Sequence, residues 1–272
     1  MSIRKRLDHL IGLHIVFSLF IFGPATPVSD MIATGIYHRW RQYPSLGRGL
    51  IHAWLLLPTW GADEAAICWV ANRDHPLNDT SGVLVLTTLG TLLLLDGSNN
   101  SVWSSGCSTR SSSPATSARL LESGNFVVQG QDDSTFQWQS FDYSSNVLLP
   151  GMKIGKNLWN GDGWYLSWWR SATDPGMGSY RYITELGGGT PENVMRNSND
   201  GTKRYRTGPW NGERFDGVPE MASFATNFSY HYQVTVSPSE ATYSYTAKQP
   251  GAPYSQVKLG EAGRSDPAAR VG

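Results

Sequence analysis

Short apolar runs broken by a glycine turn occur twice in this chain, at residues 86–97 (LTTLGTLLLLDG) and 120–129 (LLESGNFVVQ). The two runs align at an offset of 34 residues, which places Gly90 on Gly124. Glycine is favoured where a tight turn needs a positive φ, and runs of large apolar and β-branched residues between turns are typical of strands. Each run therefore predicts a strand, a turn and a returning strand, which together form a β-hairpin.

Tryptophans recur with the same period. Trp69 lies 34 residues before Trp103, and Trp138 follows 35 residues after Trp103. Each tryptophan ends a β-type run, so three similar units would bring three indoles to one shared core. Helix-pair repeats have a similar period, but glycine turns and β-type runs argue against helices. The pattern predicts a small β-prism or barrel with a core repeat of these three tryptophans.

The second half of the chain also alternates apolar and polar residues. Residues 228–236 (FSYHYQVTV) and 241–247 (ATYSYTA) alternate around SPSE and predict one hairpin. Upstream, aromatic and polar residues alternate on both sides of Asp174–Pro175, which predicts strands broken at that dipeptide. We therefore expect an all-β protein.

Composition and motifs exclude several classes of function. The 272 residues carry 22 Lys+Arg and 22 Asp+Glu, a net charge of zero, so no nucleic-acid partner is expected. Residues 151–157 (GMKIGKN) differ from a phosphate loop because the spacing is one residue short and Asn157 replaces the Ser or Thr. The six histidines are scattered. We expect no catalytic residues, no metal, no cofactor and no enzymatic activity.

The N-terminus predicts export. Basic residues precede about thirteen mostly apolar residues, a run too short to span a bilayer, so residues 1–25 are interpreted as a cleaved signal peptide and no transmembrane anchor is expected. Secretion fits three N-glycosylation sequons, at Asn78, Asn99 and Asn227. In an exported chain Cys68 and Cys107 could form one disulfide, or Cys68 could simply be a buried small residue; both alternatives stay open.

Longer motifs carry a resemblance to a known family. CWVANRDHPLNDTSGVL, ARLLESGNFVV, WQSFDYSSNVLLPGMKIG, WRSATDPGMGSYRY and YRTGPWNGERFDGVPEM resemble the ectodomain of plant S-locus glycoproteins and S-domain (G-type lectin) receptor-like Ser/Thr kinases. The resemblance covers roughly residues 62–260. It implies a bulb-type lectin domain of β-prism II fold at 61–150 and a second β-rich, lectin-like S-locus glycoprotein domain at 151–272, truncated here. Relatives continue into a kinase, but this sequence has no kinase glycine loop, catalytic aspartate loop or DFG.

The family's mannose motif, Gln-x-Asp-x-Asn-x-Val-x-Tyr, is only partly present. Laying Asn125 on its Asn gives four weak candidates for carbohydrate binding, which are Ser123, Asn125, Val127 and Gln129. Only Asn125 and Val127 match, and Leu121 stands where the motif has a hydrogen-bonding Gln. Because unpaired sugar hydroxyls are costly to desolvate, we expect weak or absent mannose binding. Asn125 is interpreted as a turn residue.

Residues 26–60 do not resemble the family. A one-nucleotide shift over residues 36–58 would restore a family-like sequence, and residues 263–272 behave similarly, so we suggest that both ends are frameshifted or mis-spliced. The first domain would then be incomplete at its N-terminus, and we expect residues 26–60 to be poorly ordered.

The sequence as a whole predicts a secreted lectin-like recognition module, with a role in cell-surface or pollen recognition implied by the resemblance. Its partner would be a glycan, a glycoprotein or peptide ligand, or another S-domain ectodomain. The alternatives are a functional mannose-binding lectin, a non-catalytic fragment of a receptor Ser/Thr kinase, and a pseudogene product.

Overall fold

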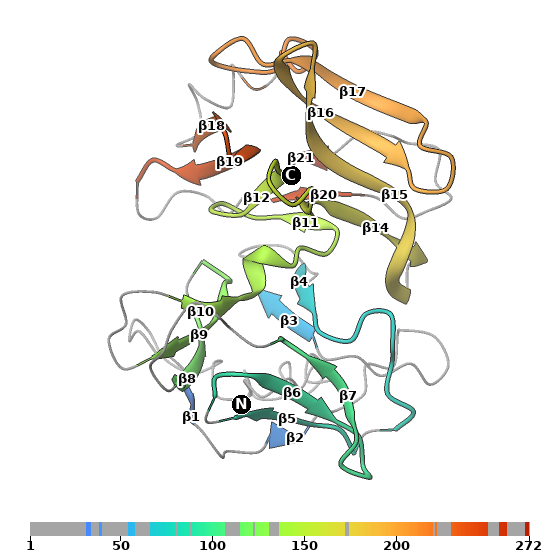
Figure 1. The fold of residues 1–272 in the computed structure, drawn as a ribbon, viewed down its shortest axis with the longest axis vertical. Coiled ribbons are helices and arrows are strands. Elements are labelled where there is room, and N and C mark those ends of the chain that lie inside the picture. The colour runs from blue at the N-terminus through green and yellow to red at the C-terminus, as the bar shows by residue number, and fades with distance from the viewer. Residues whose placement is uncertain are drawn as a thin grey trace, which may run out of the picture. The chain divides into compact units, whose positions relative to one another are not determined.

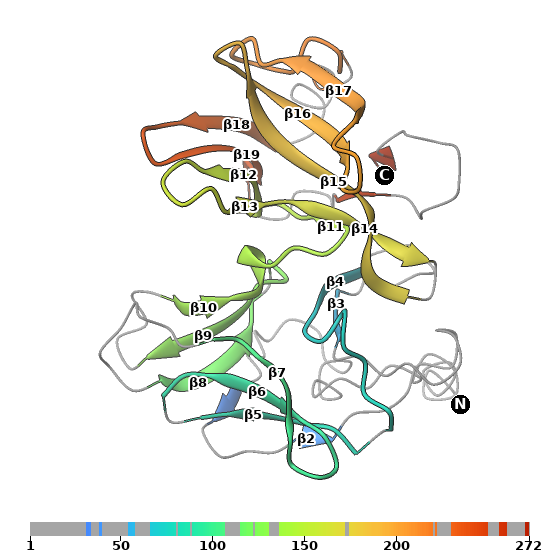
Figure 2. The same ribbon diagram turned by 45° about the vertical axis from the view of Figure 1, so that its right-hand side comes forward.

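A computed structural model describes residues 31–33, 38–39, 54–57, 66–79, 81–87, 89–106, 115–121, 123–130, 136–171, 174–219, 221, 230–249, 256–259 and 270–271. These residues form antiparallel strands joined by turns, with one short 3-10 helix, η1 (Ser140–Asp142) (Figures 1 and 2). The predicted all-β fold class is confirmed, and several antiparallel sheets are consistent with a bulb-lectin fold.

The chain divides into two compact units. The first comprises Met1–Leu56 and Trp69–Ser140, and the second comprises Leu57–Cys68 and Phe141–Gly272. The division therefore falls between Ser140 and Phe141, ten residues before the boundary expected from the resemblance.

The first unit contains two four-stranded antiparallel sheets. One has the order β2 (His38–Arg39), β5 (Val83–Leu86), β6 (Leu92–Leu95) and β7 (Ser101–Ser104). The other has the order β1 (Met31–Ala33), β8 (Ala115–Leu120), β9 (Phe126–Gly130) and β10 (Phe136–Gln139). Strands β3 (Trp54–Leu57) and β4 (Ala66–Val70) form a two-stranded sheet.

Strands β1, β2 and β3 lie inside the segment 26–60, for which the sequence predicted poor order. Strand β1 pairs with β8 and β2 pairs with β5, so both hairpins gain a further antiparallel strand. Such pairing uses backbone N–H and C=O groups, which every non-proline residue carries, so it does not require family-like side chains. The remainder of the segment, the signal peptide at 1–25 and most of 263–272 lie outside the described residues.

The second unit contains three sheets. The first has the order β14 (Leu166–Ser171), β15 (Asp174–Gly187), β16 (Thr190–Asn197) and β17 (Lys203–Pro209). The second has the order β13 (Gly163–Trp164), β12 (Lys153–Asn157), β19 (Glu240–Ala247) and β18 (Tyr230–Val236). The third joins β11 (Val147–Leu148), β20 (Val257–Lys258) and β21 (Arg270–Val271).

One predicted feature of the second half is confirmed, and a second lies a few residues from where the sequence predicted it. Strands β18 and β19 pair around the predicted turn, with Val236 opposite Ala241. Strand β14 ends at Ser171 and β15 begins at Asp174, so Asp174–Pro175 opens β15 and lies within a strand, whereas the sequence predicted a break at that dipeptide. Each unit buries its own core, formed in the second unit by aliphatic, methionine and aromatic side chains.

Candidate carbohydrate-binding site

The two repeated hairpins turn in the same way. The N–H of Thr87 donates to the carbonyl of Thr91 at 2.9 Å, and the N–H of Leu121 donates to the carbonyl of Asn125 at 2.8 Å. In each turn the intervening glycine donates back to the first residue, at 3.0 and 2.9 Å, with φ of 78° and 85°. Only glycine adopts such φ values without strain, so the sequence repeat is a repeat of backbone geometry.

The three periodic tryptophans lie together in the core of the first unit. Ring centroids are 5.4 Å apart for Trp69 and Trp103, 5.3 Å for Trp69 and Trp138, and 6.1 Å for Trp103 and Trp138, all edge to face. Each indole comes from a strand at the end of its sheet: β4, β7 or β10. Edge-to-face contacts of this kind add to the stabilisation gained from burial.

Asn125, the central residue of the degenerate mannose motif, is buried with 5% exposure. Its Nδ2 donates to Oε1 of Gln139 at 2.9 Å, and its Oδ1 accepts from the Ser140 hydroxyl at 3.3 Å. The same hydroxyl accepts the N–H of Phe126 at 2.9 Å. Both ends of the Asn125 amide are therefore used within the protein, where they tie the β8–β9 turn to the end of β10.

The other three candidates are not gathered into one exposed row. Val127 is fully buried, Gln129 is 2% exposed, and Ser123 is exposed in the turn. The reason is that β9 is buried along both faces, whereas β6 in the upstream copy alternates buried and half-buried residues. The Oε1 of Gln129 has no hydrogen-bond partner within the described part of the chain.

The predicted modification sites are only partly described. Asn78 and Asn99 are exposed, and Asn99 has a φ of 63° in the turn between β6 and β7. Asn227 and Cys107 lie outside the described residues, as does the side chain of Cys68 in β4.

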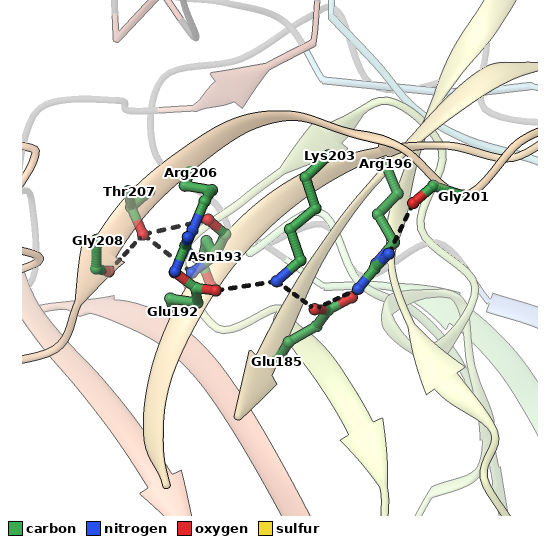
Figure 3. Close-up of polar contacts among 9 residues, drawn as sticks. All are labelled: Glu185, Glu192, Asn193, Arg196, Gly201, Lys203, Arg206, Thr207 and Gly208. Atoms are coloured by element: carbon green, nitrogen blue, oxygen red, sulfur yellow. Dashed lines mark hydrogen bonds and ion pairs between the residues drawn. The ribbon is translucent and has the colours of Figure 1, made fainter. Parts of the chain in front are cut away.

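Sequence analysis missed a charged network on the sheet β14–β17. Glu185 of β15 and Glu192 of β16 are opposite each other in the strand register, and Lys203 of β17 bridges them, with its Nζ 3.1 Å from a carboxylate oxygen of each (Figure 3). Arg196 makes a bidentate pair with Glu185, and Arg206 reaches Oε2 of Glu192 at 2.7 Å. The three basic residues of KRYR at 203–206 were a signal, but their acidic partners depend on strand register.

The network holds both carboxyl groups in their charged form. Hydrogen bonds from Arg196 lower the pKa of Glu185. Burial alone would raise the pKa of Glu192, which is 1% exposed, but hydrogen bonds from Arg206 and Lys203 outweigh it, and the pKa lies below its usual value. Because every acid is paired with bases, this arrangement is typical of a structural network.

Among the described residues, no group of three or more His, Cys, Asp or Glu side chains is arranged to hold a metal ion. Nor does any helix in the described part of the chain have the length and hydropathy needed to cross a membrane.

Comparisons with known proteins agree with the motifs. A family model described as "D-mannose binding lectin" matches residues 66–170, and an "S-locus glycoprotein domain" matches residues 205–269. The G-type lectin S-receptor-like serine/threonine-protein kinase SD1-1 of Arabidopsis thaliana is 38% identical over 195 residues, which cover 71% of this chain and 23% of the relative. The S-locus-specific glycoprotein BS29-1 of Brassica oleracea var. alboglabra is 44% identical over 162 residues, 58% of this chain and 35% of the relative.

The chain thus spans about a quarter to a third of the length of these relatives. The lectin match begins at Ala66 in β4 and continues to Arg170 in β14 of the second unit, so the family model does not end where the first compact unit does. The family predicted from the motifs is confirmed: this chain carries a D-mannose binding lectin domain and an S-locus glycoprotein domain, and it is a relative of the S-locus glycoproteins and G-type lectin S-receptor-like kinases.

Proposed function

We propose that this chain is a secreted, lectin-like recognition module acting at the cell surface, and that its β8–β9 hairpin does not bind mannose. The observation that carries the proposal is the burial of Asn125, whose amide is bonded at both ends to Gln139 and Ser140. A role in pollen recognition is supported by the similarity to S-locus-specific glycoproteins.

The physical argument concerns the cost of unpaired polar groups. A sugar hydroxyl that leaves water needs a protein partner, and a missing partner costs about 1–3 kcal/mol. The amide of Asn125 could serve a sugar only by giving up its bonds within the protein. Gln129 is buried, and Leu121 carries no hydrogen-bonding group at all. The hairpin therefore lacks the row of polar side chains that a mannose site would require.

Titration calorimetry with methyl α-mannoside and mannotriose tests the proposal. We expect no binding at millimolar or tighter affinity that depends on this hairpin. Ser123→Ala provides a matched variant, because Ser123 is the one exposed member of the candidate set. Millimolar or tighter binding that is lost in Ser123→Ala or Gln129→Ala would contradict the proposal.

A second candidate is that the module is the non-catalytic ectodomain part of a receptor kinase. The similarity to SD1-1 covers 71% of this chain but only 23% of that kinase. Expressing residues 1–272 in plant cells tests secretion directly. We expect a secreted product with glycans at Asn78, Asn99 and Asn227, and peptide mapping without reduction would show whether Cys68 and Cys107 are joined.

A further inference from the structure

Two hairpin tips of the second unit are joined side by side. The β12–β13 turn at 157–162 and the β18–β19 turn at 236–239 project together in both views of the ribbon (Figures 1 and 2). The N–H of Leu158 donates to the carbonyl of Ser239 at 2.8 Å, which links the two turns. We call residues 157–162 and 236–239 the paired tips.

Two hydrogen bonds tie Trp159 to the paired tips. Its Nε1 donates to the carbonyl of Pro238 at 3.1 Å, and its backbone N–H donates to Oδ1 of Asn157 at 2.9 Å. The side chain is nevertheless 81% exposed. One edge of the indole is thus fixed to the protein while most of its surface faces solvent. A ligand that stacked on this ring would lose little side-chain entropy, because the ring is already ordered.

Further apolar side chains are exposed on the same tips. Leu158 is 40% exposed and Val236 is 54% exposed, and Pro238 is also exposed. Single exposed apolar residues are ordinary on a protein surface, but a contiguous group with polar neighbours indicates an interaction site. Trp159, Leu158, Val236 and Pro238 lie on two turns that hydrogen bonds link to each other, with polar residues beside them.

The polar residues of the paired tips favour an uncharged, hydroxyl-rich ligand. Asn157, Asn160 and Asp162 lie in the turn that carries Trp159, and Ser237 and Ser239 lie in the other turn. Oδ1 of Asn157 accepts the N–H groups of Trp159 and Asn160, Oδ1 of Asn160 accepts the N–H of Asp162, and the hydroxyls of Ser237 and Ser239 bond each other. The Nδ2 groups of the two amides can still donate to sugar hydroxyls, and the exposed carboxylate of Asp162 can accept from them. Lys153 and Glu240 pair at 2.7 Å, and the exposed residues Lys156 and Asp162 carry opposite charges, so the described residues at the tips form no cluster of like charge to select an ion.

The size of the apolar surface argues against a stable protein contact. A whole tryptophan side chain buries roughly 150–250 Å², and a stable protein interface needs about 800 Å² from each partner. One indole with the exposed parts of Leu158, Val236 and Pro238 is well short of that area. It matches instead the scale of one or two sugar rings.

We propose that the paired tips are a carbohydrate-binding site, in which Trp159 stacks against the C–H face of a pyranose ring in a neutral oligosaccharide. The negative face of an indole attracts the weakly positive C–H groups of a sugar. The inference deepens the proposed recognition function, on which it rests, by naming the ligand class and placing the site away from the β8–β9 hairpin.

The test is a titration of the full ¹⁵N-labelled chain with mannotriose, triacetylchitotriose and cellotriose. We expect at least one of them to bind and to shift the indole Nε1–H resonance of Trp159, which is identified by its absence in Trp159→Ala. Calorimetry should show binding weakened by about tenfold or more in Trp159→Ala, and by less in Trp159→Phe, which keeps an aromatic ring. Because the side chain is exposed, neither change should alter the melting temperature.

Leu89→Ala is the matched control, since Leu89 is 77% exposed on a hairpin tip of the first unit, and it should bind the same sugar as wild type does. Binding of none of the three sugars, or equal binding by Trp159→Ala, would overturn the proposal. So would sedimentation showing that wild type dimerises and Trp159→Ala does not, because the tips would then join copies of the chain. A sugar that still binds Trp159→Ala but not Gln129→Ala would instead refute the proposed loss of the β8–β9 site.

Discussion

The first unit encloses neutral polar groups beside a cluster of indoles, whereas the sheet β14–β17 of the second unit encloses a charged carboxylate. In the first, Asn125 is satisfied by Gln139 and Ser140. In the second, Glu192 is also buried, but its ion-pair partners are Lys203 and Arg206. Both arrangements give buried polar groups hydrogen-bond or ion-pair partners, as polar groups in a folded interior require.

The difference lies in how the two arrangements respond to change. Neutral amides keep their hydrogen bonds at any moderate pH, so the core of the first unit depends mainly on packing. A carboxylate loses its ion pairs when it is protonated, so the network in the second unit depends on pH. Hydrogen exchange followed by mass spectrometry can measure the two units separately, because it reports local stability peptide by peptide.

Removing an indole from the core of the first unit should have the largest effect. Trp138→Ala removes a buried ring that contacts Trp69, Trp103 and Phe126, and should lower the free energy of unfolding by about 3–5 kcal/mol. Hydrogen exchange should rise in peptides covering β7 and β10. Trp159→Ala removes the same side chain from an exposed position and is the control. Similar losses from both variants would show that the indole cluster is not what stabilises the first unit.

The two repeated turns of the first unit should differ in how much stability they lose when the residue after the turn glycine is replaced by alanine. Asn125→Ala removes an amide that Gln139 and Ser140 need, and should cost about 1–3 kcal/mol. Thr91, at the equivalent position, is only half-buried, so Thr91→Ala should stay within about 0.5 kcal/mol. Urea unfolding of both variants checks this difference. Equal costs would mean that the Asn125 amide is not a structural tie.

Acid should weaken the second unit first. The folded pKa values of Glu185 and Glu192 are both lowered, so the stability they add is complete above the unfolded value of about 4.3 and is lost as pH falls through the folded values. As pH falls below about 4.3, exchange should rise in peptides of β15–β17 more than in those of β8–β10. Glu192→Gln should make the stability of β15–β17 less dependent on pH. A first unit that loosened at higher pH than the second would reverse the comparison.

Asp79 and Asp96 test whether a lowered carboxyl pKa makes stability depend on pH only when the carboxyl group is buried. The pKa of each is lowered by hydrogen bonds, from Ser81 and from Asn100 respectively, but Asp79 is exposed and Asp96 is only half-buried. Solvent screens such interactions, so Asp79→Asn and Asp96→Asn should leave the acid response of the first unit nearly unchanged. The readout is the exchange of peptides covering β5 and β6 over the same pH range.

Much of the fold followed from the sequence because its signals are local. Gly90 and Gly124 fix two turns, tryptophan spacing marks the three β-type runs, and the alternation around 237–240 gives the β18–β19 hairpin. The burial of Gln129 could not be predicted, because it depends on what covers the second face of β9. The charged network was missed for a related reason: Glu185 and Glu192 become neighbours only through the β15–β16 register.

The candidate site shows the same limit of local reasoning. Sequence alone showed that the mannose motif is degenerate, since Leu121 cannot hydrogen-bond. It did not show that the Asn125 amide is bonded to Gln139 and Ser140, which follow fourteen or more residues later. Nor could it single out Trp159 from the 11 tryptophans of the chain, because exposure is a property of the folded structure.

A last comparison distinguishes a buried ion pair from an exposed one on the same sheet. Arg170 and Asp174 pair at 2.8 Å, but the Arg170 side chain is largely exposed, so Arg170→Ala should cost only about 0.2–1 kcal/mol. Lys203→Met should cost more, because it leaves Glu185 and Glu192 opposed on adjacent strands without the cation that bridges them, and like charges directly opposite are destabilising. Urea unfolding at neutral pH, repeated at high salt, measures both variants. Salt should shrink the small cost of Arg170→Ala further, since exposed charges are screened, and change the cost of Lys203→Met less. The two variants could instead lower the free energy of unfolding equally and respond alike to salt. Burial would then not strengthen the network, and the contrast between the units would have to come from packing alone.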